Sequence, residues 1–327
     1  MFANSIGSKF RVTSFGESRG VALGVVIDGC PAGLALSEND IQAELNIRMA
    51  QGEFETERRE PDKCQILSGV FEGKTLGTPI SVVVYNKENS AKDYEQLKNV
   101  FRPGHADYGW HKKFSVRDYR GGGRSSGRET VSRVIAGAVA KKILEKHNIK
   151  IKAYSKEIAG VKLSGNADLD FKQNEELKSK LNKAKEEGNS LGGIIACEIK
   201  GVPAGIGEPV FSKLDAELAK AIISIGGIKG IEFGAGFELA KMTGSTSNDI
   251  EKNNNGGIIG GISDGNIICF NAVVKPVPSI KQTQKAYNAK GEIINLSITG
   301  RHDVCIVRRI LPVVEAMSAI VLADFIL

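Results

Sequence analysis

Short apolar runs alternate with amphipathic stretches along the whole chain of 327 residues. Compact apolar runs predict β-strands, and apolar positions that recur three and four residues apart predict helices. The predicted strands cover residues 21–27, 80–85, 193–199, 230–233 and 266–274. The predicted helices cover residues 37–48, 128–146, 174–187, 212–223 and 311–325. Because the two kinds of element are interspersed without regular alternation, we expect an α+β fold, with residues 1–327 forming a single domain.

One internal similarity bears on the architecture. "DGCPAGLALSENDIQAEL" (28–45) is similar to "KGVPAGIGEPVFSKLDAEL" (200–218). Each segment predicts the end of a strand, a Pro-Ala-Gly turn and a helix carrying Ala-Glu-Leu. Two structurally equivalent halves would explain the similarity, and so would coincidence.

Composition narrows the class of protein. Aromatic residues make up only 6% of the chain, with one tryptophan, which argues against a stacking surface for nucleic acid. The net charge of +6 is compatible with an acidic small molecule or a polyanion. The N-terminal residues lack a hydrophobic signal core, and no apolar run reaches membrane-spanning length. We therefore expect a cytoplasmic protein that binds neither nucleic acid nor membranes.

The cysteines and histidines argue against a metal centre. The five cysteines are widely spaced without a CxxC pair, so reduced and mostly buried thiols are expected. None of the four histidines is paired at the spacing of metal ligands. No metal site is predicted.

The segment "RDYRGGGRSSGRET" (117–130) carries the strongest local signal for binding. Its three glycines allow the backbone to approach a ligand closely. Ser126 and Glu129 have the spacing of a capping box, which predicts a helix start. A helix N-terminus flanked by Arg124, Arg128 and Arg133 would suit an anion. The alternative is a mobile loop before a core helix, with the arginines in water.

Four further segments combine charge, glycine or proline with flanking apolar runs. They are "FGESRG" (15–20), "FRPGHADYGWHKK" (101–113), "KPVPSI" (275–280) and "GRHDVC" (300–305). Loops of this composition often carry function. Each also has a plain structural explanation: a lone His105 is more often a surface or hydrogen-bonded histidine, and His302 with Asp303 could form a local ion pair.

Together these segments carry a specific resemblance. With "GGIIGGISDG" (256–265) and "VVEAM" (313–317), they resemble the chorismate synthase family in sequence and in order, from about residue 5 to residue 327. The block from residue 101 to residue 138 is the most specific part.

The resemblance implies a carbon–oxygen lyase of the shikimate pathway, which supplies aromatic amino acid biosynthesis. Such enzymes convert 5-enolpyruvylshikimate 3-phosphate to chorismate and phosphate by an anti-1,4-elimination that requires reduced FMN. The family fold places helices between antiparallel sheets in two pseudo-symmetric halves, and the assembly is a homotetramer. Either a separate flavin reductase or NADPH reduces the flavin, and the sequence does not support NADPH.

The resemblance also assigns roles to residues. His105 matches the histidine that keeps reduced flavin in the required protonation state, and Asp303 matches the carboxylate that assists deprotonation through the flavin. Arg48, Arg102 and Arg128 match positions that bind the anionic substrate. The cofactor positions are Arg124, Ser125, Ser126, Gly226, Gly227, Gly260, Lys275, Pro276, Val277, Pro278, Ser279 and Arg301.

Several positions depart from the family pattern. Arg19 stands where the family has a histidine that protonates the leaving phosphate, and arginine cannot donate a proton usefully at neutral pH. We therefore predict a slowed enzyme, or one in which another group supplies the proton. Further departures are Met49, Glu53, Gly226 with Gly227, Asn254 and Val304. The alternative reading is a catalytically impaired homologue that binds flavin or phosphate.

Overall fold

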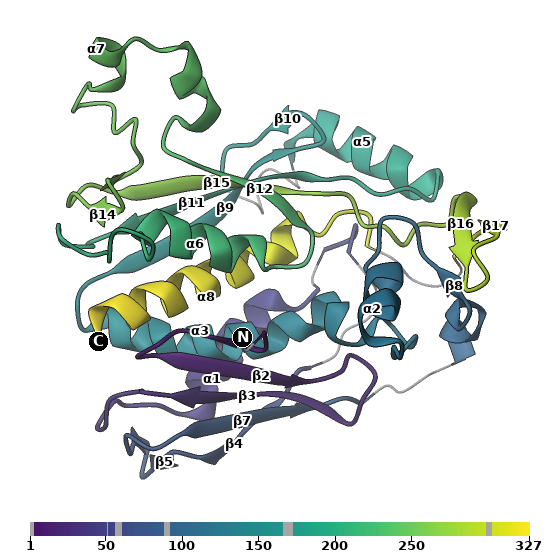
Figure 1. Ribbon diagram of the computed structural model, residues 1–327, viewed down its shortest axis with the longest axis horizontal. Coiled ribbons are helices and arrows are strands. Elements are labelled where there is room, and N and C mark those ends of the chain that lie inside the picture. The colour runs from purple at the N-terminus through teal and green to yellow at the C-terminus, as the bar shows by residue number, and fades with distance from the viewer. Residues whose placement is uncertain (1–2, 51, 56–60, 88–91, 166–172, 299–302) are drawn as a thin grey trace.

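Two antiparallel sheets enclose a layer of helices (Figure 1). The computed structural model describes residues 3–50, 52–55, 61–87, 92–165, 173–298 and 303–327. The first sheet has the order β1 (Ser5–Ile6), β2 (Arg11–Gly16), β3 (Ala22–Asp28), β7 (Ile80–Tyr85) and β4 (Cys64–Ser68). The second has the order β10 (Val161–Lys162), β9 (Lys150–Ile158), β11 (Gly193–Lys200), β15 (Ile268–Val274) and β12 (Ile228–Phe233).

The helices between the sheets are α1 (Glu38–Arg48), α3 (Thr130–Glu145), α6 (Leu214–Ile223) and α8 (Val307–Ile326). The helices α2 (Asp107–Phe114), α5 (Glu175–Glu186) and α7 (Gly244–Ser247) lie outside this layer (Figure 1). The 3-10 helices are η1 (Lys92–Leu97), η2 (Gly123–Ser125), η3 (Gly127–Glu129) and η4 (Gly236–Lys241). A small sheet joins β8 (Val100–Phe101), β16 (Gln284–Asn288) and β17 (Ile293–Leu296). One short hairpin pairs β5 (Val70–Phe71) with β6 (Lys74–Thr75). Another pairs β13 (Ile258–Ile259) with β14 (Ile262–Ser263).

The helices α3 and α8 are apolar around most of their surface, because each packs on the other helix and on a sheet. Buried side chains cover most of α3 and α8, and one contiguous core extends from Phe10 to Ala323. The two helices touch most closely at Gly137, where an added Cβ would lie 2.3 Å from Ala316 Cβ. Only glycine allows this approach, so this contact sets how closely the helices of the two halves pack. That the whole chain forms one domain stays a prediction.

The two halves are structurally equivalent, which resolves the question raised by the internal similarity. Each Pro-Ala-Gly turn leaves the central strand of its sheet, β3 or β11, and leads to a core helix, α1 or α6. Gly33 (φ 81°) and Gly205 (φ 98°) both have the left-handed backbone that makes glycine necessary in these turns. Each half then ends in its longest helix, α3 or α8. The α+β fold with pseudo-symmetric halves is therefore confirmed.

All ten predicted strands and helices are present, within a few residues of their predicted ends. The capping box at Ser126 and Glu129 was wrong. Ser126 Oγ accepts only a bond from Arg128 N (3.3 Å), at the start of η3, and α3 begins at Thr130. The Glu129 carboxylate is turned to Ser14 and Arg133 instead of to the Ser126 backbone.

The cysteine prediction was correct: all five thiols are free, and four are buried. Burial is the largest cause that raises the pKa of Cys64 to about 11, and it also raises the pKa of Cys197. Thiols held protonated in this way are poor nucleophiles.

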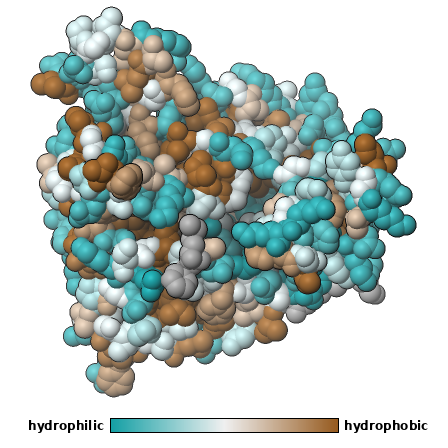
Figure 2. Space-filling model, viewed as in Figure 1, coloured by the Kyte–Doolittle hydropathy of each residue, from teal (hydrophilic) through white to brown (hydrophobic). Residues whose placement is uncertain are grey.

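An arm formed by η4 and α7 projects from the body beyond the second sheet (Figure 1). It carries exposed apolar side chains, including Phe237 (81% exposed) and Ile250 (91% exposed). Figure 2 shows hydrophobic and hydrophilic residues mixed on this arm. Among the described helices, none combines the length and apolar character needed to cross a bilayer.

Candidate active site

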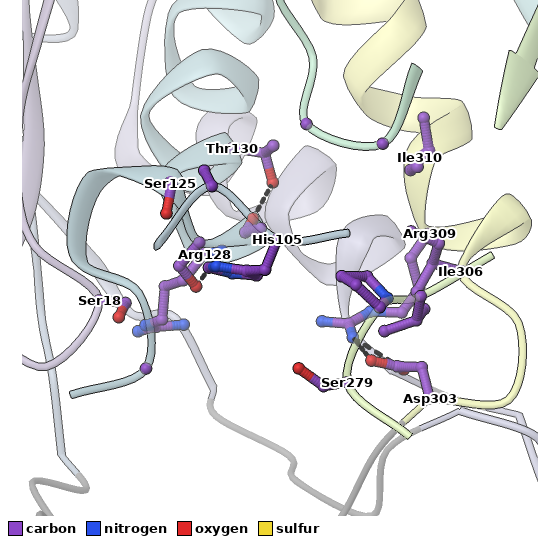
Figure 3. A pocket seen from close by; sticks show the side chains of 18 of the residues that line it. Ser18, His105, Ser125, Arg128, Thr130, Ser279, Asp303, Ile306, Arg309 and Ile310 are labelled. Carbon is purple, nitrogen blue, oxygen red and sulfur yellow. Dashed lines mark hydrogen bonds and ion pairs between the residues drawn. The ribbon is translucent and has the colours of Figure 1, made fainter. Parts of the chain in front are cut away.

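A cavity of about 540 Å³ opens where loops from the two halves meet. The first half contributes cations and hydroxyls, and the second contributes the turn after α6, the exit from β15 and the start of α8. In Figure 3, His105 lies between a wall with Ser18, Ser125 and Arg128 and a wall with Ser279, Asp303 and Arg309. Of the residues predicted from the sequence, the cavity brings together Arg19, Arg48, Arg102, His105, Ser125, Ser126, Arg128, Gly226, Gly227, Lys275, Pro276, Val277, Pro278, Ser279 and Asp303.

Two of the three glycines in the segment 117–130, Gly121 and Gly122, are required by the side chains beside them at this cavity. Gly121 (φ 69°) and Gly122 (φ 92°) both have left-handed backbone. A Cβ on Gly121 would lie 2.9 Å from Ser18 Oγ, and one on Gly122 would lie 3.1 Å from His105 Cε1 and 3.3 Å from Arg102 Nη2. The glycine backbone therefore fills the narrow space between two groups of polar side chains.

Two predicted substrate arginines are joined by one carboxylate. Asp62 Oδ1 lies 2.6 Å from Arg128 Nη1, and Asp62 Oδ2 lies 3.1 Å from Arg48 Nη1. Arg48 Nε also donates to Thr130 Oγ1 (2.8 Å), and Arg128 Nε donates to Asn86 Oδ1 (2.8 Å). The Asp62 side chain is only 2% exposed. No sequence pattern predicts a role for Asp62, because nothing along the chain links it to either arginine.

A second charged cluster surrounds His105. Asp107 accepts three bonds from Arg102: from the backbone N (3.2 Å), from Nε (2.7 Å) and from Nη2 (2.9 Å). Its Oδ1 lies 3.0 Å from His105 Nδ1 and 3.6 Å from Arg117 Nη1. Burial lowers the pKa of His105; Asp107 opposes this, and the charges of Arg102 and Lys275 add to it. The His105 imidazole is therefore neutral at pH 7.

Burial raises the pKa of Asp107, but the hydrogen bonds from Arg102 and the close contact with His105 outweigh burial and hold that pKa far below its usual range. Asp107 is therefore ionised beside a neutral imidazole. A carboxylate near Nδ1 favours the proton on that nitrogen, which leaves Nε2 as an acceptor. The α2 helix begins at Asp107, so this carboxylate also links the cavity wall to a helix start.

The opposite wall comes from the second half. Lys275 Nζ donates to the carbonyl of Gly104, and Ser279 Oγ accepts from Arg102 Nη1 (3.4 Å). Asp303 is paired with Arg309, whose Nη1 lies 3.0 and 3.2 Å from the two carboxylate oxygens. The buried Nε of Arg309 has no hydrogen-bond partner among the described residues. No motif predicts a role for Arg309, because it lies in the first turn of α8, beyond the motif that contains Asp303.

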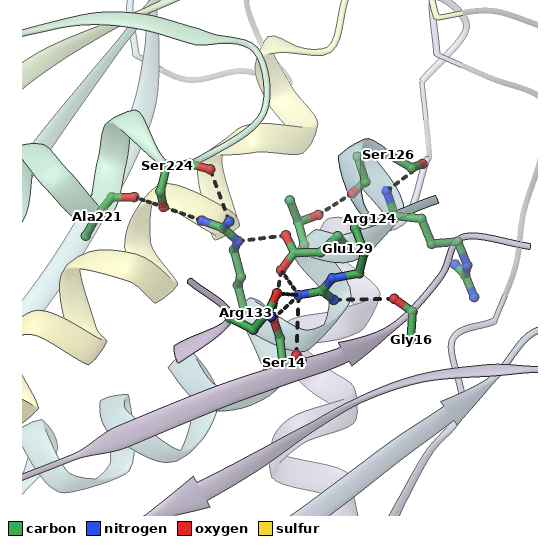
Figure 4. A network of polar contacts seen from close by, with 12 residues as sticks. Ser14, Gly16, Arg124, Ser126, Glu129, Arg133, Ala221 and Ser224 are labelled. Atoms are coloured by element: carbon green, nitrogen blue, oxygen red, sulfur yellow. Dashed lines mark hydrogen bonds and ion pairs between the residues drawn. The ribbon is translucent and has the colours of Figure 1, made fainter. Parts of the chain in front are cut away.

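Arg124 does not line the cavity. Its Nη2 donates to Ser14 Oγ (2.7 Å) and its Nη1 to the Gly16 carbonyl (3.3 Å), on the side facing β2 (Figure 4). Glu129 accepts from Ser14 Oγ (3.1 Å) and from Arg133 Nε (2.8 Å). This network holds the glycine turn onto the first sheet.

The same network reaches the second half through Arg133. Its Nη1 donates to Ser224 Oγ (2.6 Å), and its Nη2 donates to the Ser224 carbonyl (3.1 Å) (Figure 4). Ser224 lies two residues before Gly226 and Gly227, which line the cavity. Arg133 therefore connects the start of α3 to the cavity wall that the other half contributes.

The remaining predicted positions fall elsewhere. Gly260 lies in the β13–β14 hairpin, away from the cavity lining, and Arg301 lies outside the described residues. Asn254 is buried under the arm, where its Nδ2 donates to the carbonyls of Thr246 (3.1 Å) and Ser247 (3.2 Å).

Two positions that depart from the family pattern near Arg48 have different surroundings. Met49 lines the cavity, whereas Glu53 lies 3.8 Å from Lys185 outside it.

Arg19 lines the cavity and is 8% exposed, and its Nη2 donates to Tyr94 Oη (3.0 Å). Position 19 therefore contributes a permanent positive charge to the site.

The fold is an α+β sandwich of two equivalent halves, and its cavity gathers several arginines between them. The family model described as chorismate synthase matches residues 10–327. The chorismate synthase of Treponema denticola is 52% identical, over 99% of this chain and 97% of its own length, and that of Lachnospira eligens is 51% identical, over 100% and 95%. A crystal structure of chorismate synthase superposes with a TM-score of 0.75 at 30% identity, covering 98% of this chain and 92% of that one.

The chain therefore belongs to the chorismate synthase family, a family of shikimate-pathway lyases. Both the predicted family and the predicted enzyme class are confirmed. The alternative, a catalytically impaired homologue, finds no support in these comparisons.

Proposed function

We propose that the cavity between the two halves is the active site, where 5-enolpyruvylshikimate 3-phosphate loses phosphate to give chorismate. One observation carries this proposal. Arginines 19, 48, 102, 128 and 309, together with His105 and Asp303, line a single cavity although they are spread over most of the chain. A substrate with two carboxylates and a phosphate needs several cations in one place, and arginine binds such oxyanions bidentately.

Arg48, Arg128 and Arg102 are the residues that we assign to substrate binding. Asp62 neutralises part of the charge of Arg48 and Arg128, and Asp107 does the same for Arg102. Each pair keeps the guanidinium in one orientation before the substrate arrives. Such preorganisation lowers the cost of ordering the side chains on binding.

The described residues also fit reduced FMN. Ser125, Ser126 and Lys275 offer donors for a phosphate, Pro276, Ile306 and Ile310 offer an apolar wall, and the Nε of Arg309 is a buried donor without a partner among the described residues. When bound, reduced FMN supplies electron density to the ring as phosphate leaves. We therefore assign the cofactor to the wall formed by residues 275–279, 306 and 310.

His105 and Asp303 are the residues that we assign to proton handling. The neutral imidazole of His105 presents Nε2 as an acceptor, close to the Gly122 backbone. The Asp303 carboxylate, which accepts from Arg309, is the group that we assign to assisting the loss of the hydrogen from C6 of the substrate. Arg19 and Arg128 stabilise the negative charge that gathers on the departing phosphate.

The test is chorismate formation by the purified protein with pre-reduced FMN under anaerobic conditions. Appearance of chorismate and phosphate in equal amounts supports the assignment. If the protein binds FMN and substrate but forms no chorismate, the proposed function is wrong.

We also propose a cytoplasmic homotetramer whose flavin is reduced by a separate reductase. The exposed apolar side chains on the η4–α7 arm, including Phe237 and Ile250, would be covered by another copy. Sedimentation equilibrium tests the assembly. Oxidation of NADPH by the protein and FMN alone would instead assign the reductase step to this chain.

A further inference from the structure

A departing phosphate needs a proton, and few groups in the cavity can supply one. Arg19 holds its proton at all ordinary pH values. His105 is neutral at pH 7, because burial lowers its pKa, so it accepts a proton better than it donates one. Serine hydroxyls such as those of Ser18 and Ser125 are weak acids. Among the described residues, burial also lowers the pKa of Lys275 and makes its ammonium more acidic, but that residue lies on the opposite wall. The acid that directly contacts Arg19 is the phenol of Tyr94.

Contacts at both ends of its side chain hold Tyr94 in position. Its side chain packs on a small separate core formed by Leu97, Ala286, Leu296 and Ile298. At its other end, Arg19 Nη2 donates to the phenol oxygen (3.0 Å), with the guanidinium carbon 5.3 Å from the ring centroid. Because the oxygen accepts that bond, its own hydrogen is free to point elsewhere.

The hydroxyl hydrogen of Tyr94 meets no acceptor among the described residues, although the side chain lines the cavity. A phenol with its oxygen fixed by a cation and its hydrogen available is arranged as a proton donor. The cation also stabilises the negative charge that would develop on the phenol oxygen. The neighbouring contact is tight, since a Cβ on Gly121 would lie 3.2 Å from Arg19 Cγ.

We propose that Tyr94 donates the proton to the departing phosphate, with Arg19 stabilising the phenolate. The proposal rests on the function proposed above. The C–O bond between the ring and the phosphate breaks, and its electron pair goes to the phosphate oxygen, which takes the Tyr94 proton. The phenolate is reprotonated from water, and the hydrogen at C6 leaves as a proton, so charge and protons balance over the turnover.

The first test compares Y94F with the unchanged protein, both with pre-reduced FMN in anaerobic stopped flow. Loss of a positioned general acid lowers kcat by about 10²–10⁴-fold. The dissociation constant of the substrate, measured by calorimetry with oxidised FMN present, should stay unchanged. Y119F is the matched control, because the Tyr119 hydroxyl bonds Glu95 (3.2 Å) and does not line the cavity.

Four outcomes separate the two proposals. If Y94F keeps the kcat of the unchanged protein, or if it weakens substrate binding as much as it lowers kcat, the donor role is wrong and the proposed function stands. If the unchanged protein forms no chorismate, the proposed function is wrong and the donor role falls with it. A large loss of kcat alone, absent in Y119F, supports the donor role.

A second variant separates donation from a structural role. Site-specific 3,5-difluorotyrosine at position 94 keeps the hydroxyl and the ring but makes the phenol more acidic. A donor must be protonated to act, so the alkaline fall in kcat should move to lower pH. If the alkaline fall in kcat stays at the same pH, Tyr94 only positions Arg19 and the proposal is overturned.

Discussion

Arg128 Nη1 lies 2.6 Å from Asp62 Oδ1, and the other oxygen of the same carboxylate binds Arg48. One buried acid thus sets the spacing of two cations in the cavity wall. Since two positive charges meet one negative charge, the group keeps a net positive charge for an anionic ligand. Asp62 is therefore a positioning residue that leaves the site cationic.

Replacing Asp62 with Asn should weaken substrate binding more than it slows the chemical step. The amide cannot balance two guanidinium groups, so they repel each other and lose their orientation. Breaking a buried ion pair costs about 3–5 kcal/mol of stability, and we expect KM to rise about tenfold or more with a smaller fall in kcat. Steady-state kinetics and urea unfolding measure the two effects. D28N, at an exposed aspartate, is the control, and an unchanged KM in D62N would contradict the positioning role.

Replacing Gly122 with Ala should impair catalysis, because the new methyl group meets His105 and Arg102 on a backbone that alanine rarely adopts. A displacement of about 1 Å near the reacting groups costs about 10² in rate. G109A is the control, because Gly109 lies inside α2 with open space around it. That change should instead stabilise the protein by about 0.5–1 kcal/mol. Equal activities of the two variants would show that the glycine turn does not set the site geometry.

The pKa of His105 should lie below 6.5, and D107N should lower that pKa further. Asp107 is the neighbour that raises it, so its removal leaves burial and the charges of Arg102 and Lys275 unopposed. Histidine C2–H signals followed by NMR against pH measure both values, with D28N as the variant that should change neither. A rise of this pKa in D107N would contradict the assignment.

The lowered pKa of His105 also predicts how the stability of the protein depends on pH. Because the folded pKa of His105 is depressed, the unfolded chain binds this proton first as pH falls. Its contribution to stability is therefore complete above about pH 6.5 and is lost as pH falls from there through the folded pKa. Urea unfolding at successive pH values measures the loss, which H105N should reduce.

Replacing Gly137 with Ala should destabilise the whole fold, because the added Cβ would lie 2.3 Å from Ala316 Cβ where α3 crosses α8. Overpacking of this kind costs about 1–3 kcal/mol. The glycine-to-alanine change normally favours a helix, so G109A in α2 should have the opposite sign. Chemical unfolding of both variants checks the prediction, and a stabilised G137A would show that the helices can move apart at no cost.

The sequence by itself determined the elements, the class and most of the site. Periodicity predicted the ten helices and strands, since burial of one face leaves a local pattern. The Pro-Ala-Gly similarity indicated two halves, because the same turn chemistry is needed after each central strand. The motif set was specific enough to identify the family, and most of the site residues that it named line the cavity.

Only the tertiary structure decided which charged groups meet. Asp62 joins Arg48 and Arg128, Tyr94 meets Arg19, and Arg309 meets Asp303, and these contacts depend on how distant loops are brought together. The tertiary structure also directs Arg124 to Ser14, away from the cavity. At Ser126 it replaces the expected capping box with a single bond from Arg128 N. Long-range contacts of this kind leave no period and no fixed spacing along a chain, so a single sequence does not contain a local signal for them.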